Sequence, residues 1–84
     1  MSTHDDFEAA QARIKTLSSP PSQSDLLELY GLFKQAKAGD VSGKRPGMLD
    51  LKGRAKYDAW AARKGTSSED AMRAYVALVD RLVG

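Results

Sequence analysis

The stretch TSSEDAMRAYVALVDRLV, residues 66–83, combines a start signal for a helix with a helical periodicity. Thr66-Ser67-Ser68-Glu69 has the spacing of a capping box, in which a hydroxyl and an acid three residues later satisfy free amide groups. Apolar residues then recur at three- and four-residue steps, which places them on one helical face. They are Met72, Tyr75, Val76, Val79, Leu82 and Val83. The stretch therefore predicts an amphipathic helix.

The N-terminal segment predicts another helix of this kind. Its apolar stripe consists of Phe7, Ala10, Ile14 and Leu17. Thr3 is the expected cap, with Asp6 in the box position three residues later. Ser18-Ser19-Pro20-Pro21 should end the helix, because proline lacks an amide donor and restricts the residue before it.

Two further helices are expected between these segments. One begins near Ser22, with Asp25 in the box position, and ends at Gly39. Its apolar stripe consists of Leu26, Leu29, Tyr30, Phe33 and Ala36. The other runs from about Asp50 to Arg63 and ends at Lys64-Gly65. With no strand pattern, the chain is predicted to be all-α with four helices.

The segment from Ala38 to Leu49 has too many glycines and prolines for a helix or a strand. Loops of this length in small domains are usually functional or disordered. Val41, Met48 and Leu49 offer apolar anchors, so we expect the loop to pack against the helices.

The composition is that of a globular chain, with 42% hydrophobic and 29% charged residues, and its 84 residues predict a single domain spanning 1–84. No apolar stretch approaches the roughly 20 residues that span a bilayer. The polar, acidic N-terminus differs from a secretory signal, and the chain has no cysteine. These features favour a cytoplasmic protein without stable membrane insertion.

Positive charge is concentrated in the middle of the chain. Residues 34–64 contain nine of the 13 basic residues but only three of the 11 acidic residues. Such a distribution suits an anionic ligand, although a solvated surface would explain it equally well.

The residue types needed for most catalytic sites are missing. With His4 as the single histidine and no cysteine, no Cys/His or Ser-His-Asp arrangement can form. The acid pairs Asp5-Asp6 and Glu69-Asp70 are explained by helix starts. We expect no catalytic residue, no metal site and no cofactor.

Four ordered blocks resemble the acyl-CoA-binding protein family, and the resemblance extends from about Phe7 to the C-terminus. The blocks are YGLFKQAKAGD (30–40), RPGMLD (45–50), KGRAKYDAW (52–60) and KGTSSEDAMRAY (64–75). The resemblance implies an up-down-down-up four-helix bundle. It also implies a monomeric carrier that forms a pool of medium- and long-chain fatty acyl-CoA and performs no chemistry on it.

The resemblance further implies a set of ligand-binding residues. Tyr30, Lys34, Lys56 and Tyr75 look like the contacts of the CoA headgroup, with Lys15 as a further contact, and Leu27 looks like part of the acyl-chain surface. Phe33 belongs to the same set but stands where the family usually has tyrosine, so a hydroxyl is missing there. Other departures from the family pattern are Pro20, Lys37 and Tyr57.

The chemistry of these residues suits CoA. Tyr30 and Lys34 share one helical face, as do Lys52 and Lys56, so two helices could direct ammonium groups into one cleft. Lysine can approach phosphate from many directions, and an aromatic ring can stack on adenine. Periodicity alone would nevertheless assign Tyr30, Phe33 and Tyr75 to the core, and Trp60 is expected there outright.

Two other classes of function are compatible with parts of the sequence. A basic nucleic-acid binder would fit the charge of residues 34–64, but the long loop between the middle helices differs from a helix-turn-helix. An interaction module for a protein or membrane partner, with acyl-CoA as its regulator, is the remaining alternative.

Overall fold

The computed structural model describes residues 2–84, and these form four helices without a strand. The helices are α1 (Thr3–Ile14), α2 (Gln23–Ala38), α3 (Leu51–Ala61) and α4 (Ser68–Val83). The all-α prediction is confirmed.

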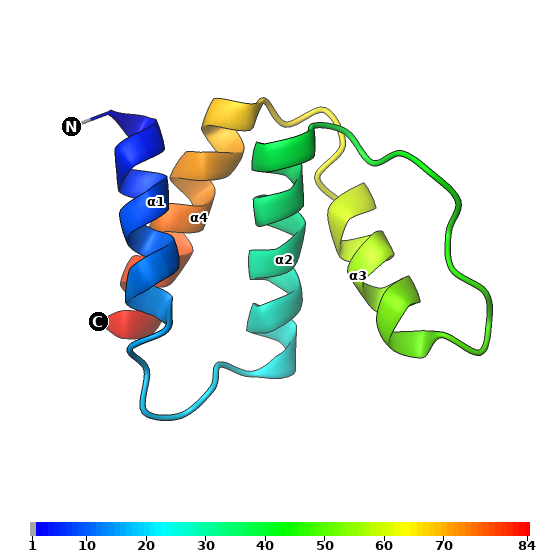
Figure 1. The fold of residues 1–84 in the computed structure, drawn as a ribbon, viewed down its shortest axis with the longest axis horizontal. Helices are drawn as coiled ribbons and strands as arrows, with labels where there is room; N and C mark the ends of the chain where they lie inside the picture. The colour runs from blue at the N-terminus through cyan, green and yellow to red at the C-terminus, as the bar shows by residue number, and fades with distance from the viewer. Residues whose placement is uncertain (1) are drawn as a thin grey trace.

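The four helices form a flattened arrangement of 39 × 29 × 14 Å, in which α1, α2 and α3 follow one another across the view of Figure 1 and α4 passes behind α1. α4 packs against both α1 and α2, and α3 packs against α2 alone. In Figure 1, α1 and α4 run in one direction and α2 and α3 run in the other. This is the expected up-down-down-up order.

Serine and aspartate side chains cap the helices. Ser22 caps α2 and Asp50 caps α3, and each accepts a hydrogen bond from the amide three residues later. Two of the expected caps are wrong by one position, because the hydroxyls of Ser2 and Ser67 cap α1 and α4. Thr3 is instead the first residue of α1, and its hydroxyl donates to Glu69.

Helix ends also differ slightly from the predictions. α1 ends at Ile14, before the Ser-Pro segment that was expected to stop it. α3 ends at Ala61, and its last turn continues through Lys64, whose amide donates to the carbonyl of Ala61. Gly65 then adopts a φ of 91°, a left-handed value that glycine adopts without strain.

The hydrophobic core lies between α1, α2 and α4. Its buried members are Phe7, Ala10, Leu29, Leu32, Ala36, Ala71, Tyr75, Leu78 and Val79. The rings of Phe7 and Tyr75 meet edge to face, with 5.1 Å between their centroids. The prediction for Leu26 was wrong, since its side chain is 46% exposed and lies outside this core.

The segment 39–50 is held by polar contacts rather than by its apolar side chains. Met48 and Leu49, expected as anchors, are 79% and 101% exposed, and only Val41 is half-buried. The Nε1–H group of Trp60 donates to the Gly39 carbonyl at 2.8 Å, and the Tyr57 hydroxyl donates to the Gly43 carbonyl at 3.0 Å. A loop tied through its backbone does not need to bury its side chains.

Within the described chain, no helix has the length and apolar character that crossing a membrane requires.

Candidate functional site

A cavity of about 460 Å³ opens beside α2 and α3. Its lining comes from the α1–α2 connection, from α2 and from α3. The lining residues are Pro20, Pro21, Gln23, Leu26, Leu27, Tyr30, Lys52, Ala55 and Lys56. We call this cavity the groove.

The groove combines apolar and cationic residues. The α1–α2 connection and the first turns of α2 supply two prolines and two leucines, and α3 supplies Ala55. Lys52 and Lys56 lie one helical turn apart on α3, and neither forms a salt bridge within residues 2–84. The groove can therefore accept a ligand with an apolar part and a negatively charged part.

Two cation–π pairs cross between α2 and α3. The Lys56 ammonium lies 5.5 Å from the centroid of the Tyr30 ring, and the Lys34 ammonium lies 4.8 Å from that of Trp60. Both distances are within the range at which a cation is attracted to the face of an aromatic ring. Each helix thus contributes one lysine and one aromatic residue.

The close approach of the two helices depends on Gly31. A Cβ atom at this position would overlap the carbonyl oxygen of Ala59 and would lie 2.8 Å from its carbonyl carbon. Because glycine has no Cβ, the backbones of α2 and α3 can touch. We call the line of contact between these two helices the seam, and the Gly31 contact fixes which residues face one another across it.

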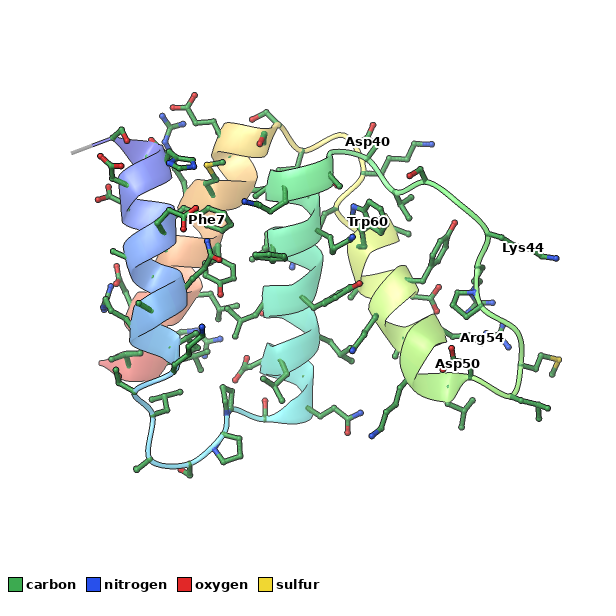
Figure 2. All side chains as sticks on the ribbon, viewed as in Figure 1. Phe7, Asp40, Lys44, Asp50, Arg54 and Trp60 are labelled. Carbon is green, nitrogen blue, oxygen red and sulfur yellow. The ribbon has the colours of Figure 1, made fainter. Side chains whose placement is uncertain are left out.

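At the far end of α3, Asp40 joins the loop to the start of the α3–α4 connection (Figure 2). Its carboxylate accepts hydrogen bonds from the Gly65 amide and from Gln35 Nε2, both at 2.8 Å. The hydrogen bond from the Gly65 amide has the largest effect on the pKa of Asp40, and the bond from Gln35 adds to it. Together they hold this pKa below its ordinary value. Gln35 is 1% exposed and also donates to the Thr66 carbonyl, so this polar cluster extends into the interior.

The predicted ligand residues fall into separate groups. Leu27, Tyr30 and Lys56 line the groove together, and Lys34 lies one turn beyond Tyr30 along α2. Tyr75 is buried in the core, where burial raises the pKa of its hydroxyl, and Phe33 is half-buried against the same core. Lys15 is exposed at the end of α1. The structure thus brings three of the seven together in the groove.

Several lining residues were absent from the predicted ligand set. In the sequence, Pro20 and Pro21 indicate the end of a helix, Pro20 is also a departure from the family pattern, and Leu26 belongs to the apolar stripe of the second helix. Lys52 could have been added, because its four-residue spacing from Lys56 already placed both on one face. Gln23 and Ala55 carried no signal, since their place in the groove depends on how the helices pack.

Among residues 2–84, no group of three or more His, Asp or Glu side chains is arranged to hold a metal ion.

Similarity to known proteins covers nearly the whole chain. The profile of a family described as "Acyl CoA binding protein" matches residues 4–79. An acyl-CoA-binding protein homolog from Manduca sexta is 54% identical over 99% of this chain and 93% of its own length. Acyl-CoA-binding protein homolog 1 from Caenorhabditis elegans is 52% identical over 92% of this chain and 90% of its own length.

Solved structures agree with the sequence comparison. The crystal structure of acyl-CoA-binding protein 2 from Oryza sativa matches with a TM-score of 0.92 and 44% identity, covering 96% of this chain and 88% of the other. Yeast acyl coenzyme A binding protein, solved in solution, matches with a TM-score of 0.72 and 45% identity, over 92% of this chain and 90% of the other. Fold and sequence together show that this chain belongs to the acyl-CoA-binding protein family.

Proposed function

We propose that this protein binds fatty acyl-CoA in the groove between α2 and α3 and carries it without chemical change. The observation that carries the proposal is the composition of the groove, in which Leu26 and Leu27 lie in the same cavity as Lys52 and Lys56. Family membership and the names of the relatives support the same ligand.

The cationic part of the groove suits the CoA headgroup. CoA carries a phosphate and a pyrophosphate, and lysine ammonium groups bind phosphate as point charges. Lys52, Lys56 and Lys34 lie along α2 and α3 and pair with no carboxylate of the residues that the structure describes, so their charges are available to a ligand. The Tyr30 ring lies beside them and offers a stacking surface for adenine.

The apolar part of the groove suits the acyl chain. Each methylene group removed from water contributes about 0.8 kcal/mol. A long chain, even half covered by the prolines and leucines of the groove, would therefore contribute about 5–6 kcal/mol. We expect acyl-CoA to bind far more tightly than free CoA, because only acyl-CoA engages both parts.

The proposal includes the remaining properties of a simple carrier. The chain would act as a single domain and a monomer, in the cytoplasm, with acyl-CoA as its partner rather than nucleic acid and without a resident cofactor. We propose it to be non-catalytic. The placement of His4 supports this, since the imidazole lies on the exposed start of α1 beside Glu8 and outside the groove.

Calorimetric titration of the protein with long-chain acyl-CoA, free CoA and free fatty acid tests the proposal. We expect tight 1:1 binding of acyl-CoA and weaker binding of the other two. Absence of both heat and thermal stabilisation at micromolar acyl-CoA would contradict the proposal. Titration of random duplex DNA in low salt tests the nucleic-acid alternative, and tighter binding of DNA than of acyl-CoA would favour it.

A further inference from the structure

The two cation–π pairs have a reciprocal arrangement. α2 provides Tyr30 and, one turn later, Lys34, whereas α3 provides Lys56 and, one turn later, Trp60. Because α2 and α3 run in the same direction (Figure 1), Tyr30 faces Lys56, and one turn later Lys34 faces Trp60. Each lysine therefore lies over a ring from the opposite helix.

The Trp60 ring is the fixed partner of its pair. It is 8% exposed, and its Nε1–H group donates to the Gly39 carbonyl at the end of α2. Its backbone nitrogen lies next to the contact between Gly31 and Ala59. Figure 2 shows Trp60 at the end of α3 near Asp40, where the loop leaves α2. Trp60 is thus held in place both by its indole N–H group and by its backbone.

Lys34 is the charged partner of this pair. Its side chain is half-buried on α2 and forms no salt bridge within the described residues. A carboxylate in place of the Trp60 ring would orient the Lys34 ammonium group, but it would also neutralise the charge and compete with phosphate. An aromatic ring orients the ammonium group while its full charge remains.

We propose that Trp60 is a positioning residue for ligand binding. Its ring holds the Lys34 ammonium at the seam, one turn beyond the groove. There the ammonium can reach a phosphate group of an acyl-CoA whose acyl chain lies in the groove. This inference rests on the proposed function for its ligand. Tyr30 does the same for Lys56, but Tyr30 also lines the groove, so Trp60 is where positioning can be measured separately.

The first test needs no ligand. In the free protein, the ε-methylene protons of Lys34 should show an upfield ring-current shift in the NMR spectrum. Trp60→Leu should return them to the position of an ordinary lysine. An unshifted resonance in the parent protein would overturn the inference, even if Trp60→Leu failed to fold.

The second test is a double-mutant cycle with Trp60→Leu and Lys34→Met, in which the dissociation constant for long-chain acyl-CoA is measured by calorimetry. Trp60→Leu alone should weaken binding about fivefold. In the Lys34→Met background it should have no further effect, because the ring then has no ammonium group to position. A purely structural role would instead give the same loss in both backgrounds, and that result would overturn the inference.

Trp60→Phe provides the matched control. Both Phe and Leu lose the Nε1–H bond to Gly39, but only Phe keeps an aromatic face. Trp60→Phe should therefore bind acyl-CoA more tightly than Trp60→Leu, at equal thermal stability. Equal affinities of the two variants would overturn the inference. A parent protein that does not bind acyl-CoA would overturn the proposed function itself, whereas the ring-current shift would still report whether Trp60 holds Lys34.

Discussion

The guanidinium group of Arg45 donates two hydrogen bonds to the carboxylate of Asp58, at 2.9 and 2.7 Å. This bidentate pair connects the loop 39–50 to the middle of α3. The hydrogen bonds from Arg45 hold the pKa of Asp58 below its ordinary value of 3.8. Together with the Tyr57 hydroxyl bond to Gly43, the pair anchors a loop whose apolar tip is exposed.

The pair predicts a dependence of stability on pH. A carboxylate whose pKa is lower in the folded state stabilises the fold above its unfolded value, and the stabilisation is lost as pH falls through the folded value. Asp58→Asn should therefore lower the unfolding temperature at neutral pH. The gap to the parent should shrink below about pH 4. Thermal unfolding between neutral and acidic pH measures this, and a constant gap would contradict it.

Asp40 should behave in the same way, for a different reason. Its pKa is lowered mainly by the Gly65 amide and the Gln35 side chain. Asp40→Asn should therefore also destabilise the protein most at neutral pH. Since Asp40 and Asp58 share no partner, the two losses should add in the double variant, and a marked departure from additivity would show coupling through the loop.

The contact between Gly31 and Ala59 predicts a strong effect of one methyl group. Gly31→Ala should destabilise the protein by about 2 kcal/mol, because the new Cβ forces α2 and α3 apart. It should also weaken acyl-CoA binding, since the groove is built from both helices. Gly47→Ala is the matched control, because no atom lies within 4 Å of its added Cβ. Denaturant unfolding and calorimetry of both variants would test this, and equal stabilities would refute the tight contact.

Tyr75 requires a different substitution from the one its predicted role suggests. The resemblance implies that Tyr75 contacts the CoA headgroup, which would make Tyr75→Ala the obvious test, but the side chain is buried against Phe7. Tyr75→Ala should therefore cost about 3–5 kcal/mol of stability. Tyr75→Phe should preserve the core, so a loss of acyl-CoA affinity in this variant would report a contact of the hydroxyl alone.

The lysines of the groove should be distinguishable from other surface lysines. Lys52→Ala and Lys56→Ala should each weaken acyl-CoA binding about fivefold, through loss of a charge-assisted contact to phosphate. Lys37→Ala removes the same charge from the exposed last turn of α2, outside the groove, and should bind like the parent protein. If Lys37→Ala were as weak as the other two, net charge rather than position would explain binding.

Much of the fold follows from local signals in the sequence. The Ser22 cap and the Gly39 stop define α2 through interactions within a few residues, and a pattern search can find them. The predicted caps of α1 and α4 fell on the threonines next to Ser2 and Ser67, because a neighbouring threonine offers the same hydroxyl group. Which of two adjacent hydroxyls faces the helix depends on how the chain enters it.

The candidate site was harder to predict, because it depends on contacts between helices. Lys34 taken alone has the pattern of a solvated charge, and nothing near it in the sequence points to Trp60. Their pairing follows from the position at which α2 touches α3, and the contact of Gly31 with the backbone of Ala59 sets that position. The exposed Met48 and Leu49 show the same limit, since hydrophobicity could not reveal that polar bonds hold their loop.

The parallel run of α2 and α3 constrains how this chain can change length during evolution. A hairpin turn joins only antiparallel helices, so the segment 39–50 must return along the whole of α3 before that helix can begin. At 1.5 Å per residue, α3 is about 16 Å long, a distance that roughly five extended residues can span. Deletions that leave fewer residues than this would force α3 to reverse, which would separate Lys56 from Tyr30. Insertions near the solvent-exposed Leu49 should be accepted, because they alter neither the return distance nor the seam.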